Sequence, residues 1–74
     1  MRVSYNKLWK KLIDLNMKKF QLKEKAGISG NSIAKLCKNE YVSLEILGKI
    51  CDALDCNIGD VCEFIKDSGD EFHE

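Results

Sequence analysis

The side chains best suited to chemistry in this chain are small, polar and hydrogen-bonding, and they follow a break between two helix-like segments. The break is Gly27-Ile28-Ser29, and the polar residues come directly after it. The residues that we expect to face outward there are Gly30, Asn31, Ser32 and Lys35. Such groups can donate to and accept from base edges in the major groove of DNA, and a glycine permits close approach.

Catalytic and metal-binding groups are sparse by comparison. The single histidine is His73, near the end of the sequence, and there is no glycine-rich loop of the kind that binds phosphate. The four cysteines lack the Cys-x-x-Cys spacing of most zinc sites; they are Cys37, Cys51, Cys56 and Cys62. We therefore expect no enzyme, no metal and no other cofactor, and interpret the cysteines mainly as small hydrophobic side chains. A thiol or metal sensor stays open as a third hypothesis.

Two short helices must hold the polar residues in place. Leu22 and Ala26 have helical spacing before the break, and Ile33 and Leu36 resume that spacing after it. A glycine suits the left-handed corner between the helices, and a serine can cap the helix that follows. The sequence therefore predicts a helix-turn-helix over about residues 19–37.

This segment resembles the helix-turn-helix domain of the phage-repressor and Cro type, the XRE-like family. The similarity lies in residues 22–29, in the later Ile33 and Leu36, and in residues 43–54. It covers roughly residues 5–65 and implies an all-α fold, a compact five-helix bundle of the lambda-repressor-like type. It also implies sequence-specific binding of double-stranded DNA by a small transcriptional regulator that acts as a repressor.

The resemblance assigns roles to individual residues. Base contacts are expected from Gly30, Asn31, Ser32 and Lys35, and phosphate contacts from Lys18, Lys19, Lys38, Asn39 and Tyr41. A homodimer on two half-sites is expected to form through Asn57, Ile58 and Val61. Lys18 and Lys19 depart from the family pattern, which usually has a polar cap followed by glutamine. A lysine cannot accept the cap hydrogen bond, but its ammonium can pair with phosphate.

The remaining boundaries follow from spacing and caps. We expect a first helix over about residues 4–15 with Ser4 as its cap, a fourth helix after Ser43, and a last helix from Ile58 to about Ile65. Residues 1–66 then form one DNA-binding domain, and residues 67–74 form an acidic, flexible tail.

Charge is distributed unevenly although the formal net charge is zero. Residues 1–49 carry +7 and residues 50–74 carry −7. The basic charge of residues 1–49 can orient the protein on phosphate. The alternative interpretation is that these charges are ordinary solvated helix surface. No segment approaches the roughly 20 apolar residues of a membrane helix, and no signal peptide is evident, so we expect a cytoplasmic protein without a membrane partner.

The competing hypothesis is a protein-interaction module, an antitoxin or adaptor that uses an exposed Phe20 or the acidic tail.

Overall fold

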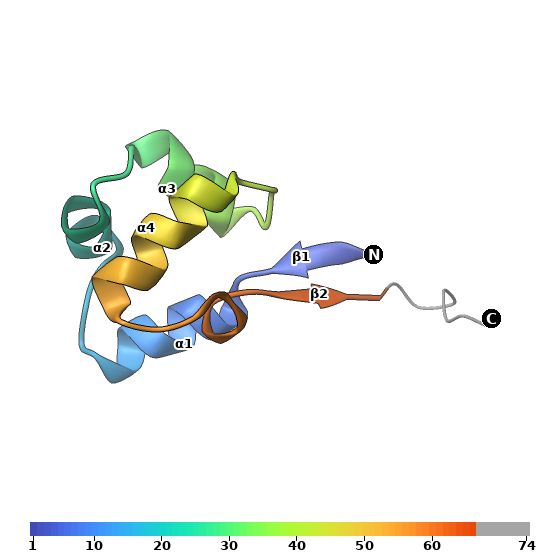
Figure 1. Ribbon diagram of the computed structural model, residues 1–74, viewed down its shortest axis with the longest axis horizontal. Helices are drawn as coiled ribbons and strands as arrows, with labels where there is room; N and C mark the ends of the chain where they lie inside the picture. Colours follow the sequence, from blue (N-terminus) through green and yellow to red (C-terminus); the bar gives the residue numbers. More distant parts are fainter. Residues whose placement is uncertain (67–74) are drawn as a thin grey trace.

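The computed structural model describes residues 1–66, in which four α-helices surround one core (Figure 1). Helix α4 packs against α2, and α2 packs against α3. A short strand precedes the helices, and a single 3₁₀ turn and a second strand follow them. In chain order the elements are β1 (Arg2–Ser4), α1 (Asn6–Asp14), α2 (Lys19–Ala26), α3 (Gly30–Cys37), α4 (Leu44–Leu54), η1 (Ile58–Asp60) and β2 (Glu63–Ile65).

The predicted fifth helix is wrong. Only Ile58–Asp60 is helical in that region, as one 3₁₀ turn, and the chain then extends into β2. The predicted cap does form in part, because the Asp60 carboxylate accepts from the Asn57 backbone N–H at 3.1 Å. Residues 61–65 include valine, phenylalanine and isoleucine, which favour strands, and a partner strand is available at the other end of the domain.

Strands β1 and β2 form an antiparallel pair that joins the two ends of the domain (Figure 1). Val3 lies opposite Phe64 in the register and is buried, whereas Phe64 is exposed. Ser4 ends β1 instead of capping a helix at residue 4. Its hydroxyl oxygen still accepts from the Asn6 backbone N–H at 3.3 Å, so Ser4 supports the start of α1 from one residue further back.

The core draws side chains from every helix and from both ends of the chain. Its fully buried members are Tyr5, Leu8, Leu22, Leu36, Ile50 and Val61. Trp9 is partly buried and packs against this cluster. Among residues 1–66, no helix has the length and apolar character needed to cross a membrane. The predicted acidic tail, residues 67–74, lies outside the described residues.

Local caps and turns fix where the helices begin and end. Ser43 accepts from the Ile46 backbone N–H at 3.2 Å and starts α4 as predicted. Asn39 and Asp55 both adopt the left-handed conformation, each with φ of 57°, and stop the helices before them. Between these two stops lies α4, whose buried side packs against α2.

Candidate nucleic-acid interface

The corner between α2 and α3 has the geometry that the sequence predicts. Gly27 is left-handed with φ of 70°, and its N–H donates to the Lys23 carbonyl at 3.0 Å. The Ser29 hydroxyl oxygen accepts from the Ser32 backbone N–H at 3.2 Å and caps α3. Ile28, on the turn itself, is buried between the two helices. The turn therefore fixes the angle at which α3 leaves α2.

One side of α3 is exposed, and three of the four predicted base-contacting residues lie on it. Gly30, Asn31 and Lys35 are exposed. The outward position expected for Ser32 is wrong, because this residue is only 7% exposed. Ser32 precedes the fully buried Leu36 by four residues, so both lie on the same, inward face of the helix. Its hydroxyl lies 3.2 Å from that of Ser29 and belongs to the cap of α3.

The start of α2 is capped by a residue that the sequence analysis missed. The Gln21 side-chain oxygen accepts from the Lys18 backbone N–H at 2.7 Å. The ammonium of Lys18 accepts nothing, so this is one half of a capping box. A glutamine three residues after the cap position was the signal that could have identified it. The first N–H groups of a helix have no partner within the helix, so this end of α2 is favourable for an anion.

Lys19 connects the start of α2 to both neighbouring helices. Its ammonium nitrogen lies 4.6 Å from the centroid of the Trp9 ring, a cation–π contact. The same nitrogen donates to the sulfur of Cys37 at 3.4 Å, and Cys37 is the last residue of α3. The Lys19 cation is thereby held beside the end of α3, where Lys38 follows Cys37 in the chain. Basic groups from two helices thus meet on the side of the molecule where α3 is exposed.

The loop after α3 holds the other predicted phosphate contacts. Lys38 and Tyr41 are exposed. The side-chain oxygen of Asn39 accepts from the Tyr5 backbone N–H at 3.2 Å, which leaves its NH₂ group as the available donor. The Tyr5 hydroxyl donates to the Glu40 carbonyl at 2.8 Å. Both bonds anchor the loop to the core and hold its exposed side chains near α3.

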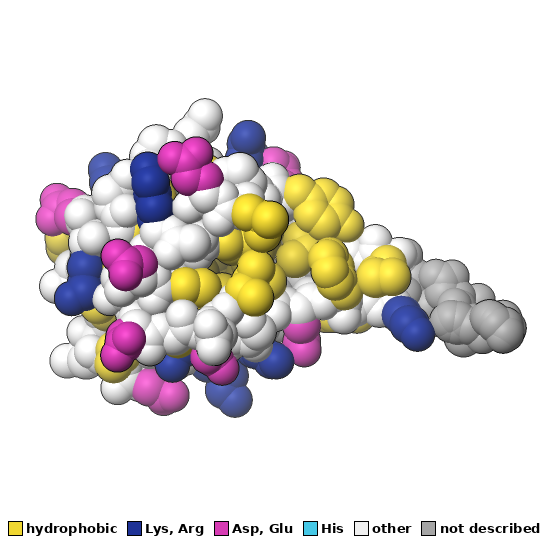
Figure 2. Space-filling view, viewed as in Figure 1, with side chains coloured by type: hydrophobic (Ala, Val, Ile, Leu, Met, Phe, Trp, Pro, Cys, Tyr) yellow, Lys and Arg dark blue, Asp and Glu magenta, His cyan; other side chains and the backbone are white. Residues whose placement is uncertain are grey.

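The predicted dimer residues divide into two groups. Asn57 and Ile58 are exposed, and Ile58 is 44% exposed. Val61 is fully buried, so its assignment to a surface is wrong, because the turn of η1 directs the chain back into the core. Hydrophobic side chains gather on the face between α4 and the strands (Figure 2). The large exposed hydrophobic residues in or beside these elements are Tyr41, Leu44, Ile58 and Phe64.

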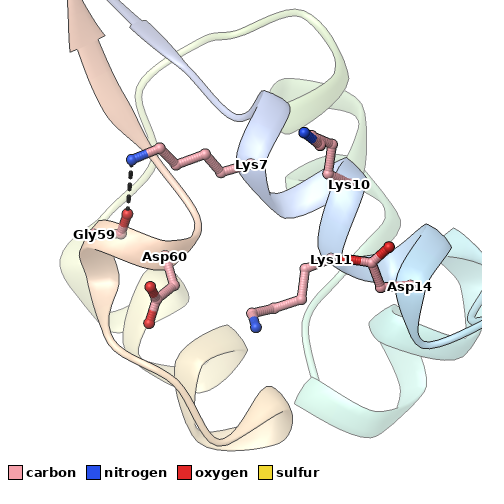
Figure 3. A pocket seen from close by; sticks show the side chains of 6 residues that line it. All are labelled: Lys7, Lys10, Lys11, Asp14, Gly59 and Asp60. Atoms are coloured by element: carbon pink, nitrogen blue, oxygen red, sulfur yellow. Dashed lines mark hydrogen bonds between the residues drawn. The ribbon is translucent and has the colours of Figure 1, made fainter.

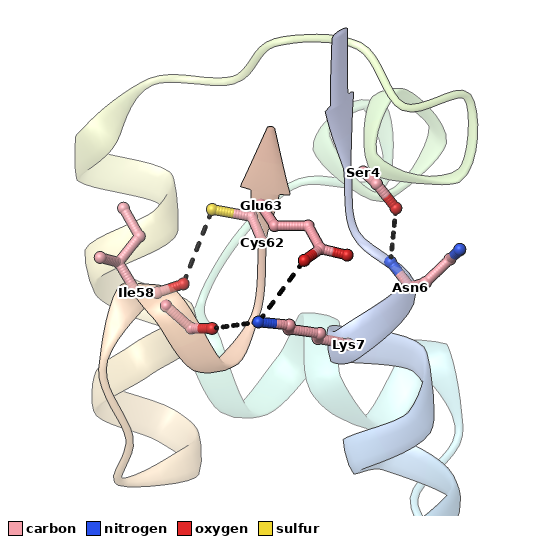
Figure 4. A network of polar contacts seen from close by, with 7 residues as sticks. Ser4, Asn6, Lys7, Ile58, Cys62 and Glu63 are labelled. Atoms are coloured by element: carbon pink, nitrogen blue, oxygen red, sulfur yellow. Dashed lines mark hydrogen bonds and ion pairs between the residues drawn. The ribbon is translucent and has the colours of Figure 1, made fainter. Parts of the chain in front are cut away.

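A second group of cations lies between α1 and η1, away from α3. The side chains of Lys7, Lys10 and Lys11 lie there with Asp14 and Asp60 (Figure 3). The Lys7 ammonium donates to the Gly59 carbonyl at 3.3 Å and lies 3.6 Å from a Glu63 carboxylate oxygen (Figure 4). These acids balance the lysines, and Lys7 ties α1 to the end of the domain.

Thiols and acids do not form a metal centre in the described part of the chain. Within residues 1–66, no group of three or more histidine, cysteine or acidic side chains is arranged to hold an ion. The four cysteines are free thiols. Burial raises the pKa of both Cys51 and Cys62, which favours their protonated forms at neutral pH.

Comparison with known proteins agrees with this geometry. The family model for the Cro/C1-type helix-turn-helix DNA-binding domain matches residues 7–67, and the chain belongs to that family. It therefore contains the DNA-binding domain of a family that is generally non-enzymatic. The crystal structure of the transcriptional regulator VanUg, in its Form II, is similar with a TM-score of 0.81 and 58% sequence identity over 84% of this chain and 83% of that chain. A search of curated proteins finds no match.

Proposed function

We propose that this protein binds a specific sequence of duplex DNA through α3 and represses transcription from the promoter that contains it. One observation carries the proposal. The exposed side of α3 lies beside a cation, Lys19, that Trp9 and Cys37 hold in place. A polar helix flanked by fixed positive charge matches a major groove flanked by phosphates. A domain bound at a promoter acts most simply by excluding other proteins from it.

Base recognition is assigned to the first part of α3. Asn31 pairs bidentately with adenine, Lys35 donates to guanine or to a nearby phosphate, and Gly30 lets the backbone approach the bases. Ser32, which the sequence analysis included, is buried in the cap and orients α3 through Ser29 instead.

Phosphate contacts are assigned to both flanks of α3. On one flank, Lys18 and Lys19 and the free N–H groups at the start of α2 bind one phosphate. On the other flank, the DNA backbone is bound by Lys38, the NH₂ group of Asn39 and the hydroxyl of Tyr41. In residues 1–66, no ion pair engages Lys18, Lys19 or Lys38. These charges are available to DNA without breaking an existing ion pair.

The functional unit on DNA is proposed to be a homodimer. One helix reads only a few base pairs, so a second copy on a half-site about 34 Å away adds specificity. Asn57 and Ile58 border the exposed hydrophobic face between α4 and β2, and that face suits a second copy of the chain. Analytical ultracentrifugation with the selected DNA tests this point. One protein per palindromic duplex at saturation would contradict it.

The experiment that tests DNA recognition begins with selection from a randomised duplex pool. Affinities for the selected site and for unrelated DNA are then measured by fluorescence anisotropy at two salt concentrations. Asn31→Ala should weaken specific binding by about 1–3 kcal/mol and leave binding to unrelated DNA unchanged. Asn6→Ala is the matched control, because Asn6 is an exposed asparagine at the start of α1. Equal effects of the two substitutions would refute the assignment.

A second candidate function is protein interaction, and an apolar groove at the corner of α1 and α2 favours it. Its lining includes Trp9, Leu12 and Met17, and Phe20 beside it is 58% exposed. A double substitution to alanine at Asn31 and Lys35, which do not line the groove, separates the two functions. It should abolish DNA binding, whereas a protein partner that uses the groove should still bind.

A further inference from the structure

The end of α4 brings two cysteines together. Asp55 is left-handed there, and the N–H of Cys56 donates to the carbonyl of Cys51 at 3.0 Å. This bond between residues five apart defines a Schellman motif, in which the side chains of its first and last residues meet. In most proteins that contact is hydrophobic. Here both side chains are thiols.

The backbone geometry suits a covalent link between the same two residues. A disulfide requires Cα atoms within about 7 Å and Cβ atoms that point toward each other. The hydrogen bond between the main chains of Cys51 and Cys56 holds them within that reach. The left-handed Asp55 completes the motif, which turns the side chains of its first and last residues toward each other. Both side chains are only partly buried, so a small oxidant can reach them.

A third thiol lies nearby but has a different partner. Cys62 interacts electrostatically with Cys51, yet its sulfur donates to the Ile58 carbonyl at 3.6 Å (Figure 4). No backbone hydrogen bond joins Cys62 to Cys51 in the described residues. Cys37 lies on α3 beside Lys19, away from this turn. The arrangement therefore selects one pair among the four cysteines.

We propose that Cys51 and Cys56 form a reversible disulfide across the end of α4, with a low-molecular-weight disulfide as the oxidant. The Cys56 thiolate attacks one sulfur of the oxidant, and the other sulfur leaves as a thiolate. Cys51 then loses its proton to water and attacks the Cys56 sulfur, which expels the second thiolate. Two protein thiols are oxidised, one external disulfide is reduced, and two small thiols are released.

The step taken by Cys51 depends on its environment. Burial, followed by the neighbouring Cys56, raises the pKa of Cys51, so Cys51 holds its proton more tightly. The attack by Cys51 therefore waits for its deprotonation. The link closes the turn that leads from α4 to η1. It does not depend on DNA, so its test is independent of the proposed function.

The test equilibrates the purified full chain in buffers of increasing oxidised-to-reduced glutathione ratio, traps free thiols with an alkylating agent, and measures intact mass. The expected product has lost two hydrogens, is monomeric, and returns to the free thiols with excess reductant. Cleavage before aspartate maps the link, because Asp52, Asp55 and Asp60 separate the three nearby cysteines into different peptides. The linked peptides should contain Cys51 and Cys56.

Variants provide the matched comparison. Cys51→Ser should stop at a mixed disulfide between Cys56 and glutathione, whereas Cys37→Ser should form the internal link as readily as the parent chain. Circular dichroism verifies that both variants fold, and the mapping of the unaltered chain does not depend on either. Absence of the internal disulfide at every glutathione ratio would overturn the proposal. A link from Cys51 to Cys62, or only links between copies, would overturn it equally.

Discussion

Replacing Tyr5 with phenylalanine removes one hydroxyl from the place where α1 meets the loop after α3. The Tyr5 side chain is 1% exposed, and its hydroxyl donates to the Glu40 carbonyl at 2.8 Å. The ring stays in the core, so packing is retained and the loss is that of one neutral hydrogen bond, about 1 kcal/mol. For a domain of this size, that corresponds to a fall in Tm of about 4–8 °C.

The Tyr5→Phe substitution should also change how the free energy of unfolding depends on pH in alkaline solution. Burial is the main cause that raises the pKa of Tyr5 above its usual value, with a smaller contribution from Cys62. A raised pKa means that folding favours the protonated hydroxyl. This stabilisation is complete below about pH 10 and is lost as pH rises through the pKa of the folded state. The stability gap between the parent chain and Tyr5→Phe should therefore narrow at high pH.

Urea denaturation followed by circular dichroism measures that gap from about pH 7 to about pH 11. Reductant is present throughout so that disulfide formation does not interfere. Cys51 and Cys62 also have raised pKa values and weaken the fold as pH rises past about 9, but they are common to both proteins and cancel in the difference. A gap that does not change with pH, or no gap at neutral pH, would refute the reasoning.

Three further predictions test the interface and the fold. Lys19→Ala should reduce the slope of log affinity for DNA against log salt by about 1, measured by anisotropy, because one phosphate contact is lost. Gly27→Ala should lower the free energy of unfolding by about 1 kcal/mol, because φ at this residue is 70°. Gly48 lies in the middle of α4 with open space around it, so Gly48→Ala should raise the free energy of unfolding by about 0.5–1 kcal/mol in the same urea assay. Leu36→Ala should cost about 2–5 kcal/mol, whereas Leu44→Ala, which is 74% exposed, should change stability by less than about 0.5 kcal/mol.

The features that the sequence predicted well depend on neighbours in the chain. The left-handed corner at Gly27, the cap at Ser29 and the cap at Ser43 each involve residues within four positions, and all three are present. In α4, Leu47 and Ile50 are buried as their helical spacing predicts, whereas Leu44 has the same spacing and is 74% exposed. Local patterns of this kind also led to the family, whose model matches residues 7–67.

The features that the sequence predicted wrongly depend on distant partners. Residues 61–65 have apolar spacing that a helix could use, but pairing with Arg2–Ser4 decides in favour of a strand. The same rearrangement buries Val61. Ser32 is a different case, because counting four residues back from Leu36 would have placed it inward. The contact of Lys19 with Trp9 could not be predicted from spacing, since it depends on how α1 and α2 cross.

The pairing of β1 with β2 also has a consequence for the chain while it is being synthesised. About 60 residues separate the two strands, and the ribosome adds roughly 5–20 residues per second. Arg2–Ser4 therefore waits on the order of 3–12 s with its hydrogen-bonding edge open before Glu63–Ile65 is made. The helix-turn-helix is complete well before that moment. Pairing of β1 with β2 therefore cannot begin until Glu63–Ile65 has been synthesised.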